Sequence, residues 1–143
     1  MFKVRQQKLA LSVALYVLRE NGFPAPKKKH VLNFIRMKRL LQFPEQELNR
    51  RRDTDIDEIW ANDICWRRKD LFMDGRVDSP ERGHWRLTET GLRKIEERKP
   101  LWIKFEEPAK RQDFLEKLDY CTPELIDWII RIAKGDSLHL TKQ

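Results

Sequence analysis

Residues 76–91 read Arg-Val-Asp-Ser-Pro-Glu-Arg-Gly-His-Trp-Arg-Leu-Thr-Glu-Thr-Gly, and this stretch carries the clearest local signals in the chain. Residues 77–78 begin an extended run, and residues 79–83 are of the kinds that form turns. Residues 84–87 then return with alternating character, which is typical of a second β-strand. Thr88 is suited to cap a helix that follows. The stretch therefore predicts a β-hairpin between two helices.

The side chains of this hairpin divide into an inner and an outer set. Trp85 and Leu87 share one face of their strand, because successive residues of a strand point to opposite sides, and we expect both in the core. Arg82 stands at the predicted tip, and Arg76 and Arg86 stand on the strands. A compact hairpin with outward arginines, entered from one amphipathic helix and leaving into another, is typical of the wing of a winged helix-turn-helix.

Charge is distributed unevenly along the 143 residues. The net charge is +7, but residues 1–52 hold 13 Lys and Arg against 3 Asp and Glu, whereas residues 53–143 hold 17 against 20. A basic half of this kind predicts a surface that binds a polyanion, although a solvated charged surface without a partner would give the same composition. The length suits one ordinary domain with a small appendage.

The sequence offers little support for catalysis, for a cofactor or for a membrane. The three histidines stand far apart outside any zinc or nucleophile motif, and the five glycines are scattered rather than gathered in a phosphate-binding loop. We therefore expect no enzyme activity, no metal site and no cofactor. Cys65 and Cys121 lack CxxC spacing, the N-terminus begins no signal peptide, and no apolar run approaches about 20 residues. A cytoplasmic protein with no membrane partner is expected.

Hydrophobic periodicity predicts four helices before residue 99 and two after it. The predicted helices cover residues 3–20, 27–41, 56–74, 88–98, 109–118 and 123–134. The first, nearly all-round apolar in its later turns, is expected to be a central core helix, and Thr122 and Gly135 are expected to cap and to end the last. Pro100 is expected to end the fourth helix, and residues 101–105 are expected to be extended. We accordingly predict a mainly α fold with a small β-hairpin: a winged helix-turn-helix over residues 1–99, followed by a C-terminal helical extension over residues 100–143 whose last residues are frayed.

The third predicted helix has an unusual outer face. Its core side is predicted to carry Trp60, Ala61, Ile64, Leu71 and Phe72, and its outer side Ile59, Asn62, Trp66, Lys69 and Met73. Apolar residues on the outer side recur every seven positions, where a solvated helix should be polar. This outer stripe either contacts DNA or is covered by the C-terminal extension, through Trp102, Phe105 or Trp128.

A family resemblance rests on residues 60–71 and 75–91. An Asn and then a Trp on a long helix are followed by a Gly, a Ser-Pro turn, Arg-Gly-x-Trp and Leu-Thr-x-x-Gly, a pattern that resembles the N-terminal winged-helix domain of Mrr-type restriction proteins. The resemblance covers roughly residues 5–98 and implies a prokaryotic module that directs a nuclease to modified, often methylated, DNA. The Asp and Gln-x-Lys signature of the nuclease domain is absent, and the C-terminal helices are not part of the pattern.

The leading hypothesis is a double-stranded DNA-binding protein, for methylated or unmodified DNA, without its own nuclease. The helix over residues 57–74 would enter the major groove, where Asn can pair with adenine and Lys with guanine, while the hairpin grips the flank. Two basic clusters would neutralise phosphates. The residues expected to contact DNA are Lys27, Lys28, Lys29, Arg50, Arg51, Arg52, Asn62, Trp66, Lys69, Arg76, Arg82, His84 and Arg86.

Other classes of function remain open from the sequence. The outer stripe and the C-terminal helices could instead make the protein an interaction scaffold, with a homodimer formed through those helices, or a transcriptional regulator. A third possibility is a detached reader of modified bases, or a fragment of a longer nuclease.

Overall fold

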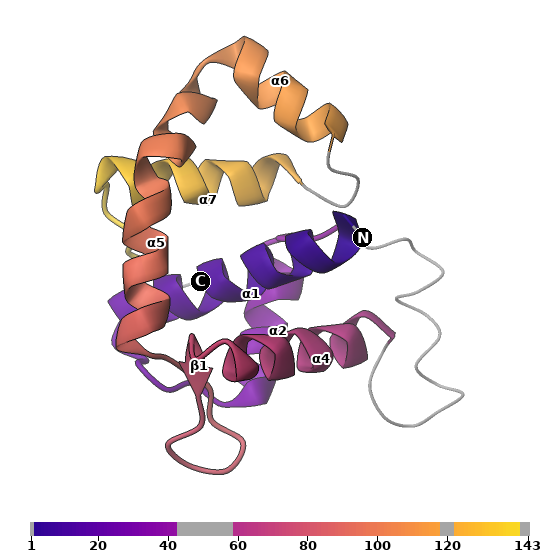
Figure 1. Cartoon of the computed structure of the whole chain (residues 1–143), viewed down its shortest axis with the longest axis vertical. Helices are drawn as coiled ribbons and strands as arrows, with labels where there is room; N and C mark the ends of the chain where they lie inside the picture. The colour runs from indigo at the N-terminus through magenta and orange to yellow at the C-terminus, as the bar shows by residue number, and fades with distance from the viewer. Residues whose placement is uncertain (1, 43–58, 118–121, 141–143) are drawn as a thin grey trace.

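The computed structural model describes residues 2–42, 59–117 and 122–140. Its elements, in chain order, are α1 (Phe2–Glu20), α2 (Lys28–Met37), α4 (Ile59–Met73), β1 (Val77–Asp78), β2 (Arg86–Leu87), α5 (Glu89–Trp102), the 3₁₀ helix η2 (Ile103–Glu106), α6 (Pro108–Lys117) and α7 (Pro123–Lys134). The protein is thus mainly α with a small β-hairpin, as the sequence predicts (Figure 1).

Helix α1 is the centre of the packing. Its second half is apolar on almost every side, and its buried residues are Ala10, Leu11, Val13, Ala14, Leu15, Val17 and Leu18. α4, α2, α7 and β2 all pack against it. Burying a side chain such as leucine contributes about 1.5–3 kcal/mol, so this helix supplies much of the stabilising apolar contact. The expectation of a central core helix is confirmed.

The hairpin lies where the sequence predicts it. A third segment, just before α2, also pairs with it, which the sequence did not reveal. β1 and β2 pair antiparallel, with Val77 opposite Leu87. The segment before α2 lies along the other side of the returning strand, where the Trp85 N–H donates to the Pro26 carbonyl at 3.0 Å and the Lys28 N–H donates to the Gly83 carbonyl at 2.9 Å. These bonds fix the hairpin against the start of α2. Trp85 and Leu87 are buried, as predicted.

A close backbone contact joins the base of the hairpin to α5. The hydroxyl of Thr88 accepts a hydrogen bond from the Gly91 N–H at 3.1 Å, which is the predicted helix cap, and donates to the Gly75 carbonyl at 2.6 Å. The Thr88 N–H donates to the Arg76 carbonyl at 2.9 Å. A Cβ atom on Gly91 would lie only 2.2 Å from that carbonyl oxygen. A glycine is therefore required there for close approach.

The prediction of an extended segment at residues 101–105 is wrong. α5 continues through Pro100 to Trp102, and η2 follows directly. Pro100 has no N–H to donate to the carbonyl four residues earlier, so one helical hydrogen bond is lost while the helix continues. Helical spacing also turns Trp102 and Phe105 to the same side, where both are buried, whereas an extended chain would point them to opposite sides.

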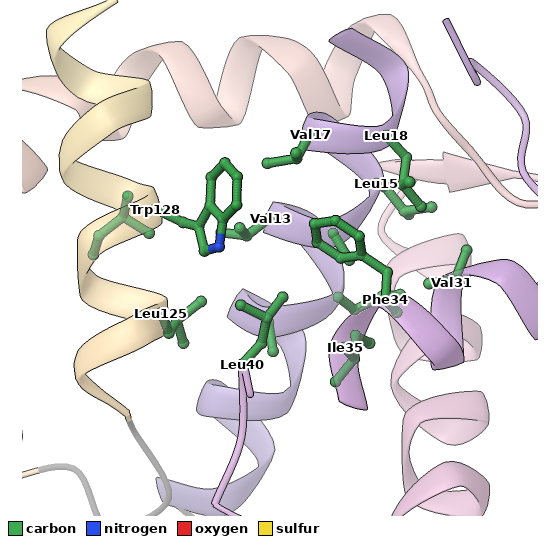
Figure 2. Packing of buried hydrophobic residues seen from close by; sticks show 14 of the residues in the cluster. Val13, Leu15, Val17, Leu18, Val31, Phe34, Ile35, Leu40, Leu125 and Trp128 are labelled. Carbon is green, nitrogen blue, oxygen red and sulfur yellow. The ribbon is translucent and has the colours of Figure 1, made fainter. Parts of the chain in front are cut away.

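α7 joins the C-terminal segment to the core of the rest of the chain. Thr122 caps the helix by accepting from the Leu125 N–H at 3.0 Å, and Gly135 ends it in the left-handed conformation, both as predicted. Trp128 points from α7 towards α1 and lies beside Phe34 of α2, with ring centroids 6.1 Å apart (Figure 2). The sequence suggests a division between residues 99 and 100, but α5 continues across that position. Buried residues from both sides of it belong to one hydrophobic core.

The segment after α7 is docked rather than frayed as far as residue 140. Asn21 donates from its side-chain amide to the Leu138 carbonyl at 2.9 Å, and its side-chain oxygen accepts from the Leu140 N–H at 2.9 Å. Leu138 is buried. One side chain at the end of α1 therefore holds the described part of the tail, through contacts 117 and 119 residues apart in the sequence that local pattern cannot reveal.

We predict that Gly91→Ala destabilises the protein by about 1–3 kcal/mol, because the new methyl group would overlap the Arg76 carbonyl. The direction of the change in the free energy of unfolding decides the question, because alanine is favoured over glycine inside a helix by up to about 1 kcal/mol where space allows. Urea denaturation would measure the change, with Thr90→Ala as the control in the same helical turn. A more stable Gly91→Ala protein would contradict the close contact.

Candidate functional site

The outer face of α4 carries polar and apolar side chains that are open to solvent. Asn62, Trp66, Lys69 and Met73 follow each other at intervals of four, three and four residues, so they share one side of the helix. All four are exposed, Trp66 by 52% and Met73 by 74% of their surface. The Lys69 ammonium lies 5.3 Å from the centroid of the Trp66 ring, which is cation–π distance.

The C-terminal extension does not cover Trp66. Trp102, Phe105 and Trp128, which the sequence suggested as its partners, are buried elsewhere in the core. One residue fewer than predicted is buried on the inner side of α4. Its buried residues are Trp60, Ala61, Ile64 and Leu71, whereas Phe72 is 48% exposed. The guanidinium of Arg68 lies 5.9 Å from the Phe72 ring. Among its described side chains, which do not include that of Ile59, α4 therefore exposes three large apolar ones, of Trp66, Phe72 and Met73.

The inner edge of α4 is fixed to α1 by a polar contact. Gln7, buried in α1, donates to the Asp63 carboxylate at 3.4 Å and accepts from the Arg67 guanidinium at 3.2 Å. Arg67 also lies 2.9 Å from the Asp70 carboxylate. These contacts make Arg67 a structural residue that sets how α4 lies on α1.

The cations of the hairpin differ in their surroundings. Arg82 is exposed near the tip and forms no ion pair with any described residue. Arg86 forms two hydrogen bonds of 2.9 Å with the Asp78 carboxylate on the paired strand, and this contact raises the pKa of Arg86. His84 is half-buried, and its Nδ1 lies 2.8 Å from the Ala25 carbonyl. Arg86 and His84 thus stabilise the hairpin, while Arg82 is free to contact a partner.

The lysine cluster at the start of α2 lies against the hairpin. Lys27 pairs with His84 as an isolated β-bridge, so the cluster and the returning strand are neighbours. Lys27 and Lys29 are exposed, and Lys28 is half-buried. The sequence held one signal for this arrangement, because two prolines in residues 23–26 favour extended backbone before α2. Arg50, Arg51 and Arg52 lie outside the described residues.

Comparison with known families adds to this geometry. The family model described as the Mrr N-terminal domain matches residues 15–97, more than half of the chain. The chain belongs to the Mrr N-terminal domain family. Comparisons with curated proteins and with solved structures gave no match. The resemblance in residues 60–91 is therefore confirmed, and it relates the chain to Mrr-type restriction systems.

The Mrr N-terminal domain match begins inside α1 and ends inside α5. It includes the outer face of α4, the hairpin and the start of α2, but neither η2 nor the two helices after it. Among the described residues, no group of three His, Cys, Asp or Glu side chains is placed to hold a metal ion. None of the helices that the structure describes is both long enough and apolar enough to cross a bilayer.

Sequence reasoning missed a second cluster of polar residues, on the other side of the hairpin base. Arg76 was predicted to contact DNA, but its half-buried side chain lines a pocket together with Arg98 and the buried Gln6. The only sequence signal was the polar character of the first turns of α1, which did not reveal that Gln6 would be buried there.

The exposure of Trp66 can be tested by fluorescence quenching. The other four tryptophans, Trp60, Trp85, Trp102 and Trp128, are buried, so one component of the emission should be quenched readily by acrylamide. Trp66→Phe should remove that component while changing the free energy of unfolding by less than about 0.5 kcal/mol, as is usual at exposed positions. If the quenchable component persisted in Trp66→Phe, the placement of this ring would be wrong.

Proposed function

We propose that this protein binds double-stranded DNA as a winged helix-turn-helix of an Mrr-related restriction system. The observation that carries the proposal is the outer face of α4, where Asn62, Trp66 and Lys69 are exposed on one side of a 15-residue helix. A helix of this size fits the major groove, which is about 12 Å wide. The hairpin follows α4 directly, as a wing that reaches the flanking DNA would require.

The charges around this face support contacts to the phosphate backbone. Lys27, Lys29 and Arg82 are exposed, and the hydrogen bonds between the Lys28–Gly83 and Pro26–Trp85 backbone groups keep the α2 start close to the hairpin. Cations of this kind position a protein on DNA without reading its sequence. Base recognition would then come from α4, with Asn62 and Lys69 as the hydrogen-bonding side chains.

Trp66 is the group through which the protein would distinguish modified DNA. Its indole is exposed and Lys69 lies over it, so a planar aromatic surface and a cation are presented together. An aromatic ring can contact a methyl group at a base edge in the major groove, where the thymine methyl is already read by apolar contact. This makes methylated duplex DNA the substrate class that the site fits best.

We further propose that this chain targets DNA without cutting it. The sequence lacks the nuclease signature expected in Mrr-type proteins, an Asp followed by Gln-x-Lys, because its one Gln-x-Lys tripeptide, at residues 6–8, has no Asp before it. Incubation of the purified chain with supercoiled methylated plasmid and Mg²⁺ should leave the plasmid intact. Cleavage that survives in every preparation and scales with protein concentration would contradict this part of the proposal.

A second function is favoured by one observation, the exposed apolar side chains of Trp66, Phe72 and Met73. Large apolar side chains that a helix leaves exposed are also used to bind proteins. The homodimer expected through the C-terminal helices would need residues other than the apolar face of α7, because that face is already buried within the chain. Sedimentation at several concentrations, with and without a short duplex, separates a DNA-dependent dimer from a scaffold that associates alone.

The DNA proposal predicts a steep dependence of affinity on salt. Each phosphate neutralised should add about −0.9 to the slope of log K against log salt concentration. Arg82→Ala should reduce the magnitude of that slope by about 0.9, the contribution of one phosphate contact. The double variant Lys69→Ala with Arg82→Ala should bind duplex DNA at least about tenfold more weakly, which corresponds to about 1.4 kcal/mol.

The matched control is Lys110→Ala. It removes one exposed lysine from α6, which lies at the end of the molecule opposite the hairpin (Figure 1). Binding to this variant should equal that of the unchanged protein, measured by fluorescence anisotropy. Equal losses in all variants, or a flat salt titration, would show that the interaction does not use the proposed surface.

Trp66→Ala tests the reading of methylated DNA separately from affinity. If the indole contacts the modified base, the ratio of the affinities for methylated and unmodified duplexes of one sequence should fall towards one. Burial of one methyl-sized apolar group against the ring contributes about 0.8 kcal/mol to binding. A preference that Trp66→Ala leaves unchanged would assign the recognition of methylation to another residue.

A further inference from the structure

A pocket of about 400 Å³ lies behind the base of the hairpin, where α1, the end of α4, α5, η2 and α6 meet. Four basic side chains, Arg5, Lys8, Arg76 and Arg98, line it together with one acidic side chain, Asp74. Among the described residues, none of the three arginines forms an ion pair. The pocket therefore gathers positive charge that the protein itself leaves unneutralised.

The arginines of the pocket repel one another. Partial burial, followed by the charges of Arg76 and Arg5, lowers the pKa of Arg98, and neighbouring Glu97 only partly offsets this effect. Arg98 and Arg5 are both exposed by surface area, and Arg76 is half-buried, so water screens the repulsion without removing it. Like charges held together in a concave site are a feature of anion-binding sites, because the bound anion removes the repulsion.

Gln6 gives an independent indication that the pocket receives a ligand. Its side chain is 1% exposed and lines the pocket, and neither its amide nitrogen nor its amide oxygen has a hydrogen-bond partner in the described part of the chain. A buried amide without a partner destabilises the folded protein by about 1–3 kcal/mol. A ligand with both a donor and an acceptor would satisfy this side chain.

The remaining walls are apolar and partly aromatic. Trp102 and Phe105 contribute from the end of α5 and from η2, and Phe114 contributes from α6, with its ring centroid 4.4 Å from that of Phe105. An ion pair of 2.8 Å between Arg111 and Asp127 holds α6 on α7 and so keeps this wall in place. The volume lies within the range of about 300–1,000 Å³ that is usual for small-molecule sites.

We propose that this pocket binds a small phosphorylated molecule of nucleotide size. Its phosphates would lie between Arg5, Arg76 and Arg98, its ring would lie against the aromatic wall, and Gln6 would hydrogen-bond to its polar edge. Arginine is suited to this task because its guanidinium matches the oxygens of a phosphate with two hydrogen bonds at once. A concave site with aromatic walls fits such a molecule better than it fits the outer surface of a DNA duplex.

Isothermal titration calorimetry of the full chain, without DNA and at fixed ionic strength, would test this site with three probes. ADP should bind, inorganic pyrophosphate should bind more weakly because it lacks the ring, and adenosine should not bind measurably. Arg98→Gln should weaken ADP binding at least about tenfold, or about 1.4 kcal/mol. Arg93→Gln, which removes one exposed arginine from the same helix, is the matched control and should leave the affinity unchanged.

Gln6→Leu provides a readout that a purely structural role would not give. Removing the unpaired buried amide should raise the melting temperature of the free protein by a few degrees, while ADP binding should weaken. A lower melting temperature would mean that Gln6 is satisfied in the folded protein, and this would overturn the argument. Failure of both ADP and pyrophosphate to bind would also overturn the proposal.

The DNA hypothesis and the pocket hypothesis can fail separately. If Arg98→Gln weakened binding to duplex DNA while neither ADP nor pyrophosphate bound, the arginines would belong to the DNA interface and the small-molecule site would be rejected. Equal effects of Arg93→Gln and Arg98→Gln on ADP affinity would show a general charge effect, which would also reject a built site.

Discussion

The carbonyl of Arg76 is the backbone group on which the arrangement of α4, the hairpin and α5 depends. It accepts the Thr88 N–H at 2.9 Å, and it is the atom that a Cβ on Gly91 would meet at 2.2 Å. The two ends of the hairpin are thereby closed, and α5 must leave at an angle that lets its first turn rest on this carbonyl. Trp102, at the far end of α5, then reaches the core that α7 completes.

Local sequence signals predicted the parts of the fold that local chemistry determines. The Thr88 and Thr122 caps, the glycine end of α7 and the buried face of the hairpin follow from preferences of single residues and from periodicity. Pro100 misled because a proline in a helix costs one helical hydrogen bond and crowds the preceding turn, and a helix can continue past it where burial outweighs that cost. Here the buried positions of Trp102 and Phe105 favour helical spacing, and only the packed structure shows where both side chains go.

The sequence predicted where the candidate site lies, but not which side chains and carbonyl groups its residues contact. Helical periodicity placed Asn62, Trp66 and Lys69 on the outer face of α4, and they are exposed there. Sequence gives the charge of a side chain but not its neighbours, so it could not show that Asp78 binds Arg86 or that Ala25 holds His84. The pocket was harder still, because its residues come from positions 5–12, 71–76 and 98–114 and meet only where α1, α4, α5, η2 and α6 come together.

Arg76 belongs to both regions through different atoms. Its carbonyl closes the hairpin, while its side chain enters the pocket with Arg98. Because its backbone is held from two sides, the arginines cannot separate by moving the hairpin base without breaking the contact at Gly91. A bound anion would therefore contact a residue whose backbone is already fixed by the hairpin base and the first turn of α5.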